Sequence, residues 1–207
     1  MRNSGANHFT EHGVDMLDKT IPYAGLYMCR KAGTPLATSC ELPEGYRFAL
    51  FSDGDEESWA AIETSVLEFD SVFSALLHFK GKFMPYADEL RRRCLFIEDA
   101  QGEKVATATA WWSDVEGRSC PWLHWVAADP RYQGLGLGKA IVSRVTQLML
   151  EIEGDVDFYL HTQTWSYKAI SIYMKNGFQP AADKRLYKDK RDNCRKALKI
   201  LRKAGKF

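Results

Sequence analysis

Hydrophobic and polar residues follow one another along this chain with two different periods, and the changes of period divide it into strands and helices. Alternating runs rich in β-branched and aromatic residues predict strands, whereas apolar residues spaced three and four apart predict helices. We expect strands at residues 23–30, 46–51, 95–98, 105–112, 122–127, 156–162 and 178–180. We expect helices at residues 55–69, 71–79, 86–93, 137–153, 166–176 and 190–204.

The order of these elements indicates the fold class. From residue 105 onward they run strand, strand, helix, strand, helix, which predicts a mixed α/β sheet. Ala106, Ala108 and Ala110 share one face of their strand, so we expect another element to pack closely there. The strand at 122–127 is almost wholly apolar, which predicts a central strand covered on both faces. A loop is expected at residues 114–120.

Length and composition favour one folded domain. The chain has 207 residues, of which 45% are apolar and 27% charged, and this suits a single globular core. We expect a loosely ordered leader at residues 1–20, one α/β domain at 21–183, and a basic amphipathic helix at 184–207 packed on the domain or appended to it. No stretch approaches the ~18 apolar residues of a membrane span, and the first residues lack the apolar core of a signal peptide. A cytoplasmic protein with no membrane partner is therefore expected.

The cysteine pattern argues against disulfides and zinc. The five cysteines are odd in number, widely spaced, and contain no C-x-x-C pair. This favours reduced thiols, so no metal cofactor is expected. The cysteines are Cys29, Cys40, Cys94, Cys120 and Cys194.

The formal charge of +1 is the sum of two opposite regions. Residues 184–207 carry eleven Lys and Arg against two Asp, a charge of +9, and the remaining 17 bases and 25 acids leave −8 on residues 1–183. Such asymmetry can reflect binding partners. The basic end is compatible with a nucleic-acid- or ribosome-associated protein. A solvated helix face is the simpler interpretation, because Tyr187 is the only aromatic among its charges.

The most informative segment is a glycine-rich turn between a predicted strand and a predicted helix. Gly134, Gly136 and Gly138 stand at every second position, so the main chain can approach a ligand closely. The N–H groups of such a turn, together with the helix dipole, suit a phosphate or pyrophosphate. Two common nucleotide motifs fail, because Lys139 replaces the last glycine of the dinucleotide fingerprint and Gln133 replaces the first glycine of the triphosphate loop. A tight turn with nothing bound is the alternative.

Two motifs together resemble those of the GNAT N-acetyltransferase superfamily. The run from Gln133 to Gly138 (QGLGLG) is similar to the family's acetyl-CoA-binding motif, R/Q-x-x-G-x-G/A. The run from Ala169 to Phe178 (AISIYMKNGF) is similar to its A-x-x-x-Y-x-x-x-G-F helix motif. The resemblance covers about residues 46–180. It implies a GNAT-type fold with a mixed, mostly antiparallel central sheet flanked by helices, and it leaves the basic C-terminal helix unexplained.

The resemblance also implies acetyl-CoA as the co-substrate. Backbone groups of Val126 and Ala128 are expected to hold the pantetheine arm in the manner of a neighbouring strand. Ser166 stands where the family often has an asparagine that binds the pantetheine, and its side chain is shorter. The pyrophosphate is expected in the turn formed by Gln133, Gly134, Leu135, Gly136, Leu137, Gly138 and Lys139.

The implied reaction is acetyl transfer to a primary amine by direct attack in a ternary complex. It needs a neutral amine, a polarised thioester and a proton for the departing thiolate. Tyr173 matches the family's tyrosine that supplies this proton, or else is an aromatic on the core face of its helix. His124 matches a histidine of some arylalkylamine acetyltransferases in the superfamily, and is either the base or a core histidine bonded to a backbone carbonyl. N–H groups beside Val126 and Ala128 would polarise the thioester carbonyl.

The expected acceptor is a small-molecule or peptide amine. Tryptophans and acids near the predicted site suit an aromatic or a cationic amine. The other interpretations are a nucleic-acid-associated protein and a non-catalytic acyl-CoA-binding module. A monomer or a homodimer is expected. The tryptophans are Trp111, Trp112, Trp122, Trp125 and Trp165, and the acids are Asp53, Asp55, Glu56, Glu57, Glu68 and Asp70.

Overall fold

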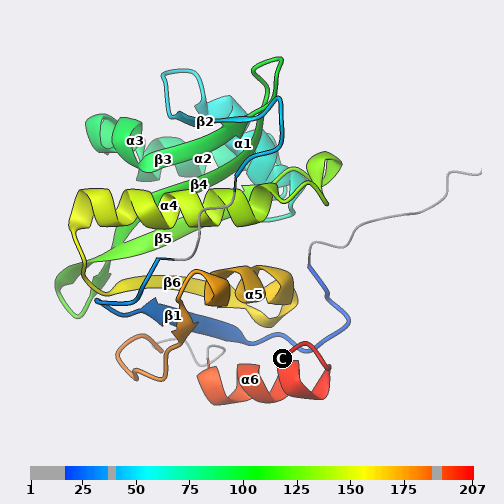
Figure 1. Cartoon of the computed structure of the whole chain (residues 1–207), viewed down its shortest axis with the longest axis vertical. Coiled ribbons are helices and arrows are strands. Elements are labelled where there is room, and N and C mark those ends of the chain that lie inside the picture. Colours follow the sequence, from blue (N-terminus) through cyan, green and yellow to red (C-terminus); the bar gives the residue numbers. More distant parts are fainter. Residues whose placement is uncertain (1–16, 37–40, 188–192) are drawn as a thin grey trace, which may run out of the picture.

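A computed structural model describes residues 17–36, 41–187 and 193–207. Its centre is a seven-stranded sheet of order β2-β3-β4-β5-β6-β1-β7, in which β5 and β6 are parallel and all other neighbours antiparallel (Figure 1). The predicted mixed, mostly antiparallel α/β sheet is confirmed. The strands are β1 (Gly25–Arg30), β2 (Arg47–Leu50), β3 (Cys94–Glu98), β4 (Lys104–Val115), β5 (Arg118–Ala128), β6 (Phe158–Gln163) and β7 (Gln179–Pro180).

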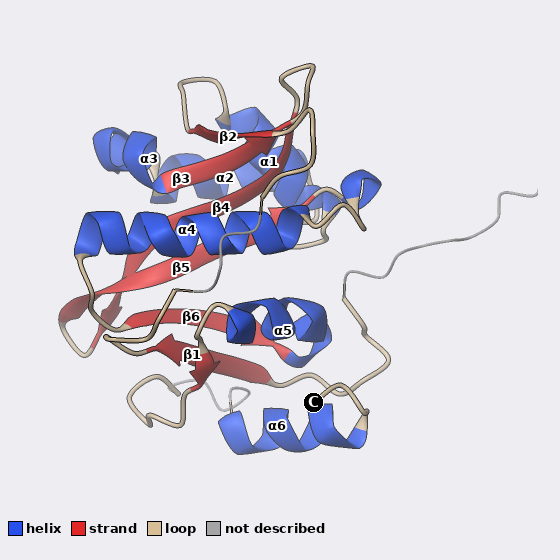
Figure 2. Cartoon of the chain, viewed as in Figure 1, coloured by secondary structure: helices blue, strands red, loops and turns tan. Residues whose placement is uncertain are grey.

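Helices flank the sheet on both faces (Figure 2). Helices α4 and α5 cover one face, α1, α2 and α3 lie on the other, and α6 lies along β1. The α-helices are α1 (Glu56–Ser65), α2 (Val72–Lys82), α3 (Ala87–Arg93), α4 (Leu137–Glu153), α5 (Tyr167–Lys175) and α6 (Cys194–Lys203). Three 3-10 turns, η1 (Met84–Tyr86), η2 (Pro130–Tyr132) and η3 (Thr164–Ser166), complete the described elements.

The alanine face of β4 receives α4, as its small side chains predict. Ala106, Ala108 and Ala110 are buried in one apolar core together with Ile141 and Val145 of α4. Small residues let a helix approach the sheet closely, and this approach carries α4 and its first turn across the middle of the sheet. A second, largely aromatic core lies between the sheet and α1 and α2.

The expected loop at residues 114–120 is wrong. Strands β4 and β5 stay paired as far as Val115 and Arg118, and only Glu116 and Gly117 turn the chain. Both turn residues have positive φ angles, 54° and 80°, as in the two-residue turns that match the twist of a hairpin. Gly117 permits this tight connection because it has no Cβ.

Two helix boundaries also differ from the prediction. The first helix ends at Ser65 rather than near residue 69, because Leu67 adopts a left-handed φ of 65° that breaks the helical path. The last helix begins at Cys194, where the Asn193 side chain caps it by accepting a hydrogen bond from the N–H of Lys196. The predicted start at residue 190 lies outside the described residues.

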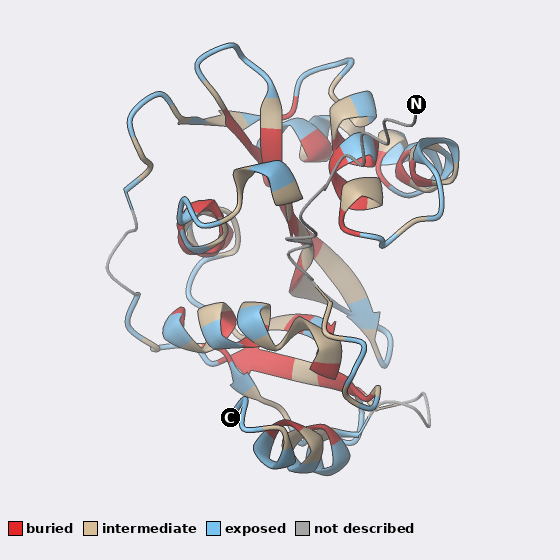
Figure 3. Cartoon of the chain, turned by 90° about the vertical axis from the view of Figure 1, so that its right-hand side faces the viewer, coloured by how far each residue is buried: buried red, intermediate tan, exposed pale blue. Residues whose placement is uncertain are grey.

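The first described residues and α6 both pack near β1 and η3. Strand β1 lies between β6 and β7, far from β2, the next strand in sequence. The segment before β1 contacts Trp165, whose Nε1 donates to the Ile21 carbonyl at 2.8 Å and whose carbonyl accepts from the N–H of Asp18 at 3.0 Å. Residues 17–20, the end of the expected leader, therefore lie against the domain. Figure 3 shows buried positions of α6, which include Ala197 and Leu201, turned toward the sheet.

Within the described residues, no helix combines the length and the apolar character needed to cross a membrane.

Candidate active site

The candidate site lies where β5 and β6 separate. The two strands pair only at Trp122 with Tyr159 and at Leu123 with Leu160. Beyond Leu123 the edge of β5 that faces β6 has no strand partner. The same stretch contains a bulge, since β5 advances three residues while β4 advances two, and Trp125 adopts a φ of 51°. Backbone groups of β5 are therefore available to a ligand at this point.

A cleft of about 620 Å³, here called the glycine cleft, opens between β5, the glycine turn, α4 and α5. It contains every predicted cofactor-binding residue except Leu135, which is 45% exposed and lies outside the lining. The lining comprises Val126, Ala127, Ala128, Tyr132, Gln133, Gly134, Gly136, Leu137, Gly138, Lys139, Val142, Ser166, Lys168, Ala169 and Ile172.

The geometry of the turn fits a phosphate-bearing ligand. Gly134 and Gly136 have φ angles of 83° and 82°, and a Cβ built at either glycine meets no atom within 4 Å. The N–H groups of Leu137 and Gly138 belong to the first turn of α4, where intrahelical partners are lacking, whereas the N–H of Lys139 donates to the Gly136 carbonyl at 3.0 Å. The buried Nε2 of Gln133 also makes no hydrogen bond to the described residues. These backbone and amide donors suit a pyrophosphate without a cluster of basic side chains.

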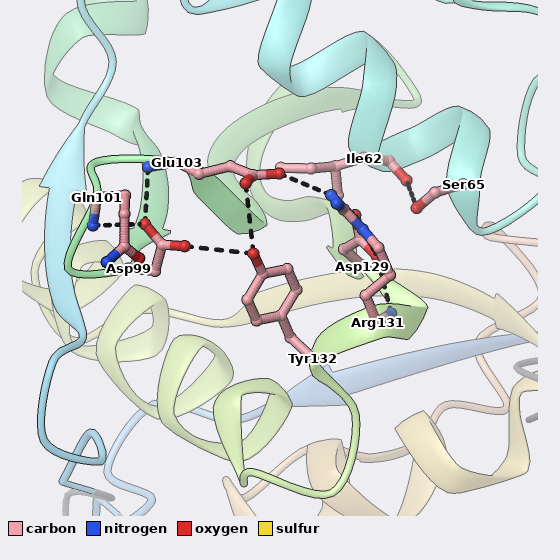
Figure 4. Close-up of polar contacts among 8 residues, drawn as sticks. All are labelled: Ile62, Ser65, Asp99, Gln101, Glu103, Asp129, Arg131 and Tyr132. Atoms are coloured by element: carbon pink, nitrogen blue, oxygen red, sulfur yellow. Dashed lines mark hydrogen bonds and ion pairs between the residues drawn. The ribbon is translucent and has the colours of Figure 1, made fainter.

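A polar network holds the segment before the glycine turn (Figure 4). The Tyr132 hydroxyl donates to Oδ2 of Asp99 at 3.2 Å, and Arg131 Nη2 donates to Oε1 of Glu103 at 2.7 Å, so η2 is tied to the β3–β4 hairpin. Asp129 accepts from the N–H of Arg131 at 2.8 Å. Although burial opposes it, hydrogen bonding to Arg131 lowers the pKa of Asp129. The network thus fixes the entrance of the turn.

A second cavity of about 270 Å³, here called the inner cavity, adjoins the glycine cleft at Val126, which lines both. It occupies the gap between β5 and β6 and receives side chains from both faces of the sheet, Glu63 from α1 and Tyr173 from α5. Its lining comprises Glu63, Glu68, Trp122, Leu123, His124, Trp125, Val126, Leu160, His161, Thr162, Gln163 and Tyr173.

A third cavity of about 290 Å³ shares Trp122, His124 and His161 with the inner cavity. Its wall also includes Ser113 of β4 and Leu186, which follows β7 in the chain. Because successive cavities share lining residues, the glycine cleft, the inner cavity and this outer cavity form a row across the site.

Tyr173 lies in the wall of the inner cavity and is 7% exposed. Burial raises the pKa of its hydroxyl, and the nearby charges of Glu63 and Glu68 raise it further. The phenol therefore keeps its proton near neutral pH and can act as a proton donor.

His124 lies where the inner and outer cavities meet. Its Nε2 is 3.0 Å from the Ser113 hydroxyl oxygen. Burial lowers the pKa of His124 to about 4, with a contribution from the positive charge of Lys82, while a hydrogen bond to the Trp112 backbone opposes the shift. The imidazole is therefore neutral at pH 7. His124 thus lies on a cavity wall and also bonds to the backbone, and its role as the base stays a prediction.

Glu63 is the residue of this site that the sequence prediction missed. It is 1% exposed, and its Oε1 makes no hydrogen bond to the described residues. Burial raises the pKa of its carboxyl well above the usual value, and the charge of Glu68 adds to the effect. The signal was present in the sequence, because Glu63 stands four residues after Trp59 and so belongs to the apolar face of its helix.

The other candidate acids divide by location. Glu68 lines the inner cavity. Asp53 and Asp55 instead form ion pairs with Arg91 and Lys104, each at 2.9 Å.

The tryptophans divide in the same way. Trp122 and Trp125 line the inner cavity. Trp111 is buried in the aromatic core, and the ring of Trp112 stacks on the ring of Trp111 with 4.1 Å between the ring centroids. Trp165 contacts the segment before β1.

No metal-binding group was found among the described residues. No cluster of three or more His, Cys, Asp or Glu in this part of the chain has a suitable arrangement. Cys29, Cys94, Cys120 and Cys194 carry free thiols, and Cys40 lies outside the described residues.

Comparison with known proteins identifies relatives of this fold. Residues 43–178 match the family model described as the acetyltransferase (GNAT) family. A GCN5-related N-acetyltransferase from Sphaerobacter thermophilus has a similar structure, with a TM-score of 0.61 and 19% identity over 78% of this chain and 49% of that one. Similar proteins from Kribbella flavida and Colwellia psychrerythraea have TM-scores of 0.52 and 0.56, with 19% and 12% identity. They cover 76% and 77% of this chain, and 54% of each of those chains.

This chain thus spans about half the length of these solved structures. At such low identity, the likeness concerns the fold. A search of curated proteins found no match.

Proposed function

Because the chain belongs to the acetyltransferase (GNAT) family, we propose that it is an N-acetyltransferase that moves an acetyl group from acetyl-CoA to a primary amine by direct attack in a ternary complex. One observation carries the proposal. The glycine cleft, which suits the co-substrate, adjoins at Val126 an inner cavity that is lined by the acid Glu63 and by the protonated phenol of Tyr173. Donor and acceptor can therefore meet without an acyl-enzyme.

The glycine cleft supports binding of acetyl-CoA. The turn from Gln133 to Lys139 would hold the pyrophosphate through backbone N–H groups and the start of α4. The free edge of β5 at Val126 and Ala128 would pair with the amide groups of the pantetheine, as one strand pairs with another. Ser166, at the opposite wall beside the start of α5, is available for one further hydrogen bond.

The chemistry would be divided among groups around Val126. N–H groups near the bulge of β5 polarise the thioester carbonyl, an effect that requires no side chain. Tyr173 gives its proton to the departing thiolate. Among the side chains that line the inner cavity, those able to accept the proton of the amine are Glu63, Glu68, His124 and His161.

The inner cavity also supports a class of acceptor. Its aromatic walls, Trp122 and Trp125, suit a ring or the stem of a cationic side chain, and its acids, Glu63 and Glu68, favour an ammonium group. We therefore propose a small-molecule or peptide amine without a carboxylate next to the reacting nitrogen. The nucleic-acid alternative rests on the charge of the basic end alone, and the comparisons do not favour it.

A binding measurement and an amine screen test this function. Acetyl-CoA is expected to bind in calorimetric titration. CoA release should follow for at least one compound in a panel of aromatic monoamines, polyamines, aminoglycosides, amino acids and peptide N-termini. Absence of acetyl-CoA binding would refute the proposal. Binding without release from any amine would favour the non-catalytic acyl-CoA-binding module.

A further inference from the structure

Among the residues that the structure describes, Glu63 is a buried acid without a counter-charge. Its side chain is buried, one of its carboxylate oxygens has no hydrogen bond, and no positive charge among the described residues contributes to its pKa. A buried carboxyl without a partner costs stability, so a purely structural role does not explain it. Its position in a cavity wall points instead to a ligand that supplies the missing partner.

The fold brings Glu63 into the same cavity as Tyr173. Glu63 comes from α1 on one face of the sheet, and Tyr173 comes from α5 on the other, yet both line the inner cavity because β5 and β6 have separated there. Glu63 is also the first of the two charges that act on the Tyr173 hydroxyl. Val126 lines both this cavity and the glycine cleft, so the two spaces are neighbours. A nitrogen in the inner cavity would thus lie between a carboxylate, a phenol and the acetyl donor.

We propose that Glu63 is a catalytic residue that accepts the proton of the acceptor's ammonium group, and that the inner cavity therefore selects small cationic amines. The assignment rests on the proposed function of the chain, since it concerns the same reaction. It makes the acid of α1, rather than the histidine of β5, the proton acceptor.

The step balances with the groups present. One proton passes from the ammonium nitrogen to a carboxylate oxygen of Glu63, and the neutral nitrogen bonds to the thioester carbonyl carbon. The carbon–sulfur bond breaks, and the thiolate takes the hydroxyl proton of Tyr173. The nitrogen loses its second proton to the tyrosinate, which restores Tyr173, and Glu63 releases its proton to solvent. The products are the amide, the free thiol and one proton.

The pKa shifts of Glu63 and His124 agree with the choice of Glu63 as the base. A general base works best when its pKa is near the operating pH. Burial raises the pKa of Glu63 well above its usual value, whereas burial lowers the pKa of His124 to about 4. The other titratable groups that line the inner cavity or interact with Glu63 are Glu68 of the α1–α2 turn, Tyr173 of α5, His161 of β6 and Cys94 of β3.

The deciding experiment compares Glu63→Gln with two other variants of the full chain. Glu63→Gln removes the charge and keeps the size, so kcat/KM for a cationic amine is expected to fall about 100-fold or more. The acid limb of the pH profile should disappear, while the affinity for acetyl-CoA stays unchanged. Glu44→Gln is the matched control, because Glu44 is exposed and lines neither the inner cavity nor the glycine cleft. His124→Gln should retain the acid limb.

A stability measurement gives a second readout that does not require activity. The folded state holds the Glu63 proton more tightly than the unfolded chain, whose glutamate pKa is about 4.3. Wild-type stability therefore decreases, relative to Glu63→Gln, as the pH rises from about 4 through the raised pKa. Thermal melts should show a higher Tm for Glu63→Gln than for wild type at pH 8.5, and a smaller difference at pH 5.

The outcomes separate this assignment from the proposed function. If wild type acetylates an amine but Glu63→Gln keeps its rate and its acid limb, the assignment is overturned and the proposed function stands. If Glu63→Gln fails to fold, or melts below wild type at pH 8.5, Glu63 holds the fold through its own contacts and the assignment is likewise overturned. If wild type neither binds acetyl-CoA nor releases CoA, the proposed function fails and the assignment fails with it.

Discussion

The glycine cleft and the inner cavity share Val126, but they are built in different ways. The groups of the glycine cleft that we propose to bind acetyl-CoA are largely backbone groups from one continuous stretch, β5 and the turn that follows it. The inner cavity consists of side chains from α1, the α1–α2 turn, β5, β6 and α5. A site made by consecutive residues tolerates changes in its side chains, whereas a site made by distant side chains depends on each of them.

The contrast also extends to electrostatics. The glycine cleft can hold a polyanion in a region of the chain with a charge of −8, because a helix start and N–H groups supply partial positive charge. The inner cavity uses ionisable side chains whose pKa values are moved by burial, upward for Glu63 and Tyr173 and downward for His124. We therefore expect substitutions in the glycine cleft to affect binding, and substitutions in the inner cavity to affect the chemical step.

The largest expected effect concerns the inner cavity. Tyr173→Phe removes the hydroxyl and keeps the ring, so kcat is expected to fall about 100-fold, because the thiolate leaves without its proton donor. The dissociation constant for acetyl-CoA should stay within about twofold of wild type, as measured by calorimetry. Tyr46→Phe is the control, since Tyr46 lies outside the linings of the glycine cleft and the inner cavity. Equal kcat values for Tyr173→Phe and wild type would remove Tyr173 from the mechanism.

An intermediate effect is expected in the glycine cleft. Gly136→Val places a β-branched residue at a φ of 82°, which costs about 2 kcal/mol and should weaken acetyl-CoA binding roughly 30-fold with kcat little changed.

Lys139→Ala should change the affinity for acetyl-CoA about threefold at most, since an exposed charge contributes little.

Gly117→Val is the control for backbone strain. Gly117 has a similar φ, 80°, but lies in the β4–β5 turn outside the cleft. This variant should lose thermal stability and keep its affinity for acetyl-CoA. Equal losses of affinity in the Gly136 and Gly117 variants would contradict a binding role for the glycine turn.

The smallest expected effect is a pH-dependent change in stability. The pKa of His124 is about 4 in the folded chain and about 6.5 when unfolded, so the unfolded state binds a proton first as the pH falls. Wild type should therefore lose stability between about pH 6.5 and pH 4, and His124→Gln should lose less over the same interval. Thermal melts of both proteins at half-unit steps measure the difference. If Tm falls equally for both proteins over this interval, burial does not lower the pKa of His124.

The parts of the structure that could be predicted follow local rules. The glycine turn was predicted from spacing alone, because glycines two residues apart and the start of a helix make an anion site without help from distant residues. The alanines of β4 likewise predicted close packing. The loop at 114–120 was predicted wrongly, because Glu116-Gly117 can turn the chain in two residues and strand pairing then continues through positions whose side chains carry little strand signal.

The parts that could not be predicted depend on pairing between distant segments. The sequence indicated a strand at 23–30, but its place between β6 and β7 depends on hydrogen bonds to residues more than a hundred positions away. The basic end is similar. Its charge was evident in the sequence, whereas only the packed structure shows that Ala197 and Leu201 are buried in the core that contains β1. Periodicity identifies the buried face of an element but not its partner.

By itself, the sequence determined the fold class, through the order of its elements, and the resemblance to the GNAT family and the glycine turn, which rest on short runs of neighbouring residues. The tertiary structure alone decided that Glu63 and Tyr173, 110 positions apart and on opposite faces of the sheet, line one cavity. That meeting requires β5 and β6 to separate after two paired residues. Where two strands stop pairing depends on segments that are distant in the chain, which no local pattern encodes.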